Sequence, residues 1–328
     1  MQVIETALTR LLGIEHPIML APMGSAAGGK LAAAVTHAGG LGMVGSGYAD
    51  AATIRRELSE AGNARVGIGF INWALEKNPA ALDVALEAQP VAVMLSFGDP
   101  TPFTGKIRQA GCRIICQVQT LAQAREAAEA GADIIIAQGR DAGGHSGTTR
   151  GTMGLVPAVV DAVAPIPVVA AGGIADGRGL AAALALGAAG VSMGTRFTAS
   201  RESLWDQSMK AETLRAGGDD TAQTRVFDIV RAAAWPASYP GRALRNAFSA
   251  RWHGQEDALA SGRAEAETAY LATAADDFST RVVWAGEGVD LVTDVLSAAE
   301  IIERVVAQAA ETMRGAARLV RQAGSHGR

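Results

Sequence analysis

One pattern of apolar and polar positions recurs along the chain. An alanine-rich helical stretch is followed by a glycine and then by a short β-branched apolar run, as in residues 180–187 and 190–193. The glycine suits the left-handed end of a helix, and a nearly continuous apolar run is typical of a strand buried on both faces. Helices that alternate with such strands predict parallel βαβ units.

Eight runs of this kind are expected strands. They lie at residues 17–22, 41–45, 65–71, 91–97, 113–118, 133–138, 167–171 and 190–195. Eight parallel units predict a closed (β/α)₈ TIM barrel of the α/β class. The main alternative is a doubly wound open sheet. The glycine motif that usually follows the first strand of that fold is absent, because the first run here ends in Ala21-Pro22-Met23-Gly24.

The chain changes character after the eighth expected strand. Residues 201–283 are more polar and contain Trp205, Trp235 and Trp252 as well as helix-breaking prolines. We expect a helical insertion here that caps the active site, followed by a closing helix near residues 298–319. The expected domains are therefore a barrel formed by residues 1–200 and 286–328, and a helical cap formed by residues 201–285.

Composition and charge narrow the classes of function. The chain has 328 residues, of which 49% are hydrophobic, and its net charge is −4 without a basic stripe, so no nucleic-acid partner is expected. The most apolar tract, residues 156–175, is interrupted by Asp161, Pro165 and Pro167, so no membrane span is expected. Cys112 and Cys116 would lie about 13 Å apart in one strand, too far for a disulfide. These features favour the cytoplasm.

Two glycine-rich strand ends point to a phosphate site. In parallel barrels the active site forms from the loops at the carboxyl ends of the strands. Gly172-Gly173 follows the seventh expected strand, and Gly194-Thr195 follows the eighth. Free backbone N–H groups after these two strands commonly hold a phosphate in this fold, although each glycine pair could instead make only a tight turn.

The loop after the sixth expected strand contains the candidate catalytic residue, His145. Gly143, Gly144 and Gly147 surround it and supply no packing for a buried structural role. A histidine there could act as a base or as a hydrogen-bond donor to an anion. The five histidines are scattered and no metal-ligand spacing occurs, so no metal site is expected. Phosphate loops together with Gln117 and Gln138 suit a flavin, whose ring offers many hydrogen-bonding atoms.

Several sequence blocks, in this order, resemble the nitronate monooxygenase family, formerly called 2-nitropropane dioxygenases, and its relative the FMN-dependent enoyl-ACP reductase. The blocks are His16-Pro17-Ile18, Ala21-Pro22-Met23, Ala38-Gly39-Gly40-Leu41-Gly42, Ala137-Gln138-Gly139, Ala142-Gly143-Gly144-His145, the run from Val168 to Gly179, and Met193-Gly194-Thr195-Arg196-Phe197. The resemblance covers nearly the whole expected barrel. It is much more specific for the superfamily than for the reaction.

The resemblance implies FMN as cofactor and His145 as catalytic residue. Together with the strand-end positions it assigns flavin contacts to Met23, Gly69, Gln117, Gln138, Gly143, Gly172, Gly173, Ser192, Met193, Gly194 and Thr195. One position departs from the family pattern, because Gly69 stands where the family usually has Asn, and Asn72 follows three residues later.

Two further blocks favour the nitronate branch. They are Ser96-Phe97-Gly98-Asp99-Pro100 and Trp284-Ala285-Gly286-Glu287-Gly288. The leading hypothesis is therefore oxidation of alkyl nitronates by O₂. The alternatives are an NAD(P)H-dependent FMN reductase of enoyl thioesters or quinones, and a binding protein for a phosphorylated ligand without redox chemistry. The expected partners are a small-molecule substrate and O₂. The sequence leaves the oligomeric state open, a homodimer included.

Overall fold

The eight expected strands form one closed parallel barrel in the computed structural model, which describes residues 2–147 and 149–320. The strands are β1 (Ile18–Leu20), β2 (Met43–Gly45), β3 (Gly67–Ile71), β4 (Ala92–Ser96), β5 (Arg113–Val118), β6 (Ile134–Gln138), β8 (Val168–Ala171) and β9 (Gly190–Met193). Their order in the sheet is β1-β9-β8-β6-β5-β4-β3-β2, and a bridge between Met19 and Leu41 closes it. The predicted TIM barrel is confirmed.

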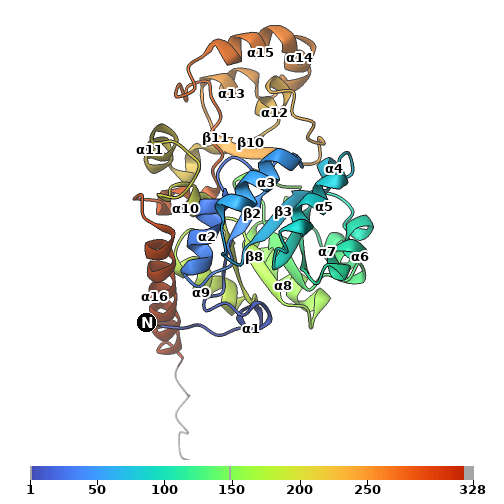
Figure 1. The fold of residues 1–328 in the computed structure, drawn as a ribbon. Coiled ribbons are helices and arrows are strands. Elements are labelled where there is room, and N and C mark those ends of the chain that lie inside the picture. The colour runs from blue at the N-terminus through green and yellow to red at the C-terminus, as the bar shows by residue number, and fades with distance from the viewer. Residues whose placement is uncertain (1, 148, 321–328) are drawn as a thin grey trace, which may run out of the picture.

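Helices surround the barrel and follow its strands in turn (Figure 1). The outer helices are α2 (Gly29–His37), α3 (Ala51–Glu60), α5 (Ala80–Glu87), α6 (Thr101–Gln109), α7 (Leu121–Glu129), α8 (Thr152–Val163), α9 (Gly177–Ala185) and α16 (Ala298–Ala317). The short helix α1 (Ala7–Leu12) precedes β1, whereas α4 (Asn72–Leu75) and α10 (Thr195–Thr198) follow β3 and β9. The closing helix is α16, as predicted. Its capping box pairs Ser297 with Glu300, and it packs mainly on α9.

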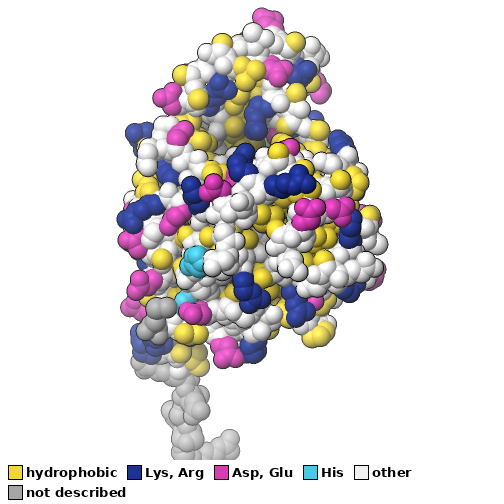
Figure 2. Space-filling view, viewed as in Figure 1, with side chains coloured by type: hydrophobic (Ala, Val, Ile, Leu, Met, Phe, Trp, Pro, Cys, Tyr) yellow, Lys and Arg dark blue, Asp and Glu magenta, His cyan; other side chains and the backbone are white. Residues whose placement is uncertain are grey.

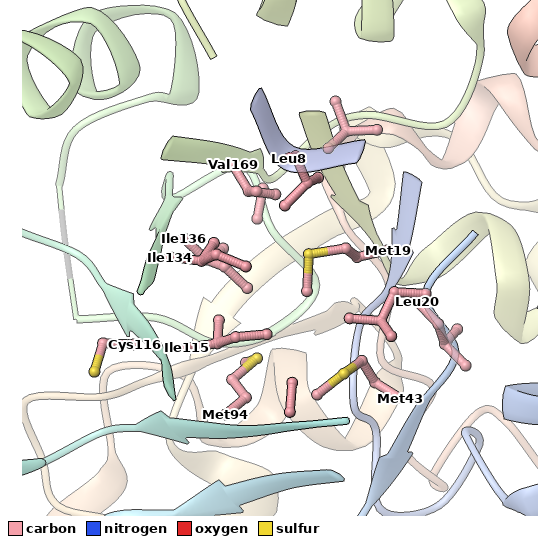
Figure 3. Packing of buried hydrophobic residues seen from close by; sticks show 14 of the residues in the cluster. Leu8, Met19, Leu20, Met43, Met94, Ile115, Cys116, Ile134, Ile136 and Val169 are labelled. Atoms are coloured by element: carbon pink, nitrogen blue, oxygen red, sulfur yellow. The ribbon is translucent and has the colours of Figure 1, made fainter. Parts of the chain in front are cut away.

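The inside of the barrel is filled by apolar side chains. Met19, Met43 and Met94 point towards one another in Figure 3, whereas Cys116 points away from them. Met19 and Met43 are fully buried, and Met94 is 2% exposed. A ligand must therefore bind at an end of the barrel and not within it. Over the described residues, no helix is long and apolar enough to cross a membrane.

The insertion after β9 is mostly helical but also contains strands that the sequence did not predict. Its helices are α11 (Gln207–Arg215), α12 (Val226–Val230), α13 (Ala247–Trp252), α14 (Glu256–Ser261) and α15 (Arg263–Ala272), followed by the 3₁₀ helix η2 (Glu287–Leu291). Strands β10 (Thr221–Thr224) and β11 (Gly241–Leu244) form an antiparallel sheet with β7 (Gly144–His145). Figure 1 shows this sheet between the barrel and helices α12 to α15. Strands of two to four mixed residues carry no apolar run that would announce them.

The expected barrel domain includes residues 321–328, and this part of the prediction lies outside the described residues.

On the face shown in Figure 2, Lys and Arg side chains alternate with Asp and Glu and form no continuous basic surface.

Candidate active site

A cavity of about 410 Å³ lies between the carboxyl ends of the barrel strands and the insertion, and residues of both line it. Trp205, Arg231 and Trp235 from the insertion, with Trp284 at its end, complete the lining. The cavity brings together eleven of the twelve predicted site residues, which are Met23, Gly69, Gln117, Gln138, Gly143, His145, Gly172, Gly173, Ser192, Gly194 and Thr195. Met193 does not line the cavity and is fully buried in the core.

The loops after β8 and β9 line the cavity and contain backbone N–H groups without an acceptor among the described residues. Gly173 has φ +67°, a left-handed conformation that favours glycine. Gly194 has φ −108° and precedes the helical turn α10. Within the part of the chain that the structure describes, the N–H groups of Gly173 and Gly194 donate to no protein acceptor. Free N–H groups of this kind can bind an anion.

The segment around η2 is held against these two loops. The N–H of Gly286 donates to Thr195 Oγ1 at 3.0 Å. A Cβ on Gly288 would lie 2.5 Å from the carbonyl oxygen of Gly173, so only glycine fits there. The buried Arg196 pairs with Asp294 at 2.8 Å, and burial lowers the pKa of Arg196 while Asp294 opposes that shift. This ion pair ties the end of β9 to the segment, a role that the sequence did not reveal.

Gly69 makes room for the neighbouring strand end. A Cβ there would lie 2.3 Å from Cγ of Pro22, so a larger side chain is excluded. Asn72 does not replace the missing amide, because it is not part of the cavity lining. Its side chain donates to the carbonyl of Gly98 at 3.0 Å and accepts from the N–H of Ser96 at 3.1 Å. Asn72 therefore fixes the end of β4.

A glutamine network supports the backbone of His145. Oε1 of Gln138 accepts from Nε2 of Gln117 at 3.2 Å and from Nε2 of Gln119 at 2.9 Å. Nε2 of Gln138 then donates to the carbonyl of His145 at 3.1 Å. Gln138 thus acts on the position of His145 as well as lining the cavity. Gln119 was not predicted, because it lies beyond the strand end in a turn.

The side chain of His145 is packed, and the expectation that its glycine-rich loop leaves it without packing is wrong. It is only 11% exposed, and its Nε2 lies 3.0 Å from both carboxylate oxygens of Asp228. The imidazole stacks on Trp235, with centroids 3.5 Å apart and planes 6° from parallel, and Trp284 lies on another side at 5.1 Å. All of this packing comes from residues 83 or more positions away in the chain.

Two buried polar atoms in the cavity wall lack a protein partner. They are Oγ of Ser46 and Nε1 of Trp205, neither of which forms a hydrogen bond with any described residue. Buried polar atoms are normally paired, so each can bind a ligand that enters the cavity. Among residues 2–147 and 149–320, no group of three or more His, Cys, Asp or Glu side chains could hold a metal ion.

The fold and the cavity define a TIM-barrel enzyme whose site lies at the carboxyl ends of the strands. The family model described as nitronate monooxygenase matches residues 5–65 and 76–308. The chain belongs to the nitronate monooxygenase family, a family of oxidoreductases.

Individual relatives differ in their assigned activity. The chain is 33% identical to the nitronate monooxygenase of Neurospora crassa, with 94% of each chain covered. It is 38% identical to (3aS,4S,5R,7aS)-5-hydroxy-7a-methyl-1-oxo-octahydro-1H-indene-4-carboxyl-CoA dehydrogenase of Rhodococcus jostii over 70% of this chain, but it spans only 65% of that relative. The solved structure of FabK from Thermotoga maritima is similar with a TM-score of 0.84 and 33% identity, over 97% of this chain and 100% of FabK.

Proposed function

We propose that the protein is an FMN-dependent nitronate monooxygenase that oxidises alkyl nitronates with O₂. The observation that carries this proposal is the pairing, in one cavity, of an anion-binding backbone wall at Gly173 and Gly194 with the imidazole of His145. The Neurospora crassa relative, which aligns over 94% of both chains, supports the substrate class.

The cavity wall fits FMN. Gly173, Gly194 and Thr195 would hold the phosphate through backbone N–H groups. The unpartnered Oγ of Ser46 and Nε1 of Trp205 would each gain a hydrogen bond from the bound group. When bound, FMN would accept electrons from the nitronate and deliver them to O₂. The remaining predicted contacts, Met23, Gly69, Gln117, Gln138, Gly143, Gly172 and Ser192, line the same cavity.

The chain's own residues would bind and orient the substrate. His145 would act on the substrate from the insertion side, held by Gln138 through its backbone carbonyl. Residues 201–285 would serve as the cap of the barrel and keep water from the cavity, because Trp205, Arg231 and Trp235 all reach its lining. We also place the protein in the cytoplasm, as both cysteines are free thiols.

Cofactor release and oxygen uptake test this proposal. The purified protein should release FMN and not FAD on denaturation, and it should consume O₂ with ethyl nitronate in the absence of any nicotinamide. A protein that binds no flavin, or one that holds FMN but consumes no O₂ with nitronates of different chain length, would contradict it. A boiled sample is the control for spontaneous oxidation of the nitronate.

A second candidate is an NAD(P)H-dependent FMN reductase of enoyl thioesters or quinones. The 38% identity to a carboxyl-CoA dehydrogenase favours it, as does the structural similarity to FabK. NADH or NADPH consumption without O₂, dependent on an enoyl thioester or quinone, would identify this activity. Nitronate-dependent O₂ uptake would then be slow or absent.

A further inference from the structure

Asp228 is the partner that the insertion brings to His145. It lies in α12, is 5% exposed, and places both carboxylate oxygens 3.0 Å from Nε2 of His145. We propose that Asp228 is a positioning residue that holds His145 in the tautomer with its proton on Nε2, so that Nδ1 is the atom that accepts a proton from the substrate. The tautomer is inferred from the contact of Nε2 with the carboxylate of Asp228, whereas the use of Nδ1 on a nitroalkane rests on the proposed function.

Hydrogen-bonding chemistry fixes the tautomer. An ionised carboxylate only accepts hydrogen bonds, so the nitrogen that faces both oxygens of Asp228 must carry a proton. In a neutral imidazole the lone pair is then on Nδ1. Nδ1 makes no hydrogen bond with any residue that the structure describes, and His145 is part of the cavity lining. Nδ1 is therefore the ring nitrogen left for a ligand.

The surrounding contacts fix where the ring lies but not where its proton lies. Trp235 stacks on one ring face, and the backbone of His145 pairs with Gly241 of β11. A Cβ on Gly241 would lie 3.3 Å from Nε2, so that strand passes close to the ring. None of these contacts accepts a hydrogen bond from Nε2. The choice of tautomer thus depends on Asp228.

The step that Nδ1 would perform is a proton transfer. Nδ1 takes the α-proton of a neutral nitroalkane, and the electron pair of the broken C–H bond moves into the nitro group to form the nitronate. The imidazolium that results keeps its Nε2 proton and remains paired with Asp228. No oxidant is consumed in this step. A preformed nitronate needs no such transfer, so only the neutral substrate should depend on Asp228.

The Asp228→Asn variant tests the tautomer without relying on activity. An amide of the same shape can turn its NH₂ group towards Nε2 and donate to it, which moves the imidazole proton to Nδ1. Side-chain ¹⁵N spectra of histidine-labelled protein should show the Nε2–H form of His145 in the wild type and its loss in Asp228→Asn, with the signal assigned through His145→Asn. Asp228→Glu keeps a carboxylate and should retain the Nε2–H form. Because the amide can also accept through its oxygen, Asp228→Leu, which offers no acceptor, is the decisive variant, and an unchanged preference for the Nε2–H form in Asp228→Leu would overturn the proposal.

Kinetics test the consequence for the reaction. Asp228→Asn should lower kcat/KM for nitroethane by about 10²-fold, the lower end of general-base contributions, and should lower kcat/KM for ethyl nitronate much less. In a His145→Asn background the same substitution should cause no further loss. The exposed Asp257→Asn is the matched control. Equal losses with both substrate forms would show a merely structural role and overturn the proposal. A wild type that oxidises neither form would instead contradict the proposed function, while the tautomer test would still stand.

Discussion

The two sides of the cavity are built from different parts of the protein. The barrel side includes Gly173 and Gly194 at the ends of β8 and β9, whose N–H groups have no acceptor among the described residues, together with the amide side chains of Gln117 and Gln138. The insertion side consists of side chains, with Asp228 and Trp235 arranged around His145. Binding of a cofactor phosphate and handling of a substrate proton can therefore be disturbed separately, and a substitution on one side should leave the function of the other intact.

The largest effect is expected on the barrel side, from Gly194→Val. A Cβ at Gly194 would lie 3.3 Å from Sδ of Met23, a contact that a flexible side chain can relieve, but branched methyl groups would enter the space of the phosphate. Losing two charge-assisted hydrogen bonds at about 1.5–3 kcal/mol each predicts roughly 10²–10⁴-fold weaker FMN binding. Fluorescence titration with FMN measures it.

The matched control for this change is Gly154→Val, because a Cβ at Gly154 meets nothing within 4 Å. Gly173 is a poorer test site, since its φ of +67° strains any side chain whether or not a phosphate binds. If Gly194→Val retained FMN with wild-type affinity, the backbone wall would be only a pair of tight turns.

The next effect is expected on the insertion side, from His145→Asn. Loss of the base should lower kcat/KM for nitroethane by about 10²–10⁴-fold. The rate with ethyl nitronate should fall much less, and the FMN content should stay at the wild-type level because the proposed phosphate contacts are made by Gly173, Gly194 and Thr195 and not by His145. Steady-state O₂ consumption with both substrate forms checks this. Full activity of the variant with both substrate forms would show that His145 is not a catalytic residue.

A smaller effect is expected where the two sides meet. Trp235 stacks on His145, and its indole N–H donates to the hydroxyl of Tyr48 on the barrel at 3.1 Å. Trp235→Ala should lower kcat/KM for nitroethane by about tenfold, the equivalent of roughly 1.4 kcal/mol of lost stacking and ordering. Trp235→Phe keeps an aromatic ring and should stay near the wild type. Identical kinetics for the two variants would show that stacking does not order the imidazole.

The smallest effect concerns a buried histidine just before β1 and the pH dependence of stability. His16 is 2% exposed, its Nδ1 has no partner among the described residues, and burial lowers its pKa in spite of nearby Glu15. The unfolded chain therefore binds the proton more readily, so the free energy of unfolding should fall by at most about 1.4 kcal/mol per unit as the pH drops below about 6.5.

Urea unfolding at several pH values measures this dependence. His16→Asn should flatten the decrease, whereas the exposed His37→Asn should leave it unchanged. A decrease of the same steepness in His16→Asn would mean that other groups cause it.

The sequence predicted the barrel side well because local rules govern it. Most of the strands are nearly continuous apolar runs, and the loops after β8 and β9 carry their glycines directly at the strand ends. The contacts on the insertion side could not be predicted, because no local sequence pattern determines them. The contact of Asp228 with His145 spans 83 residues, and His145 lies in β7, which pairs with β11 in a sheet that no apolar pattern predicts. Met193 was predicted to contact the flavin because it belongs to the same sequence block as Gly194. Side chains alternate along a strand, however, and that of Met193 is buried in the core.

The most direct test of the account is anaerobic mixing of the purified protein with ethyl nitronate while the flavin absorbance is followed. The account predicts that the nitronate bleaches the flavin without any nicotinamide, and that admitting O₂ restores the colour. A flavin that nitronate leaves oxidised, but that NADH or NADPH reduces promptly, would contradict it and favour the reductase.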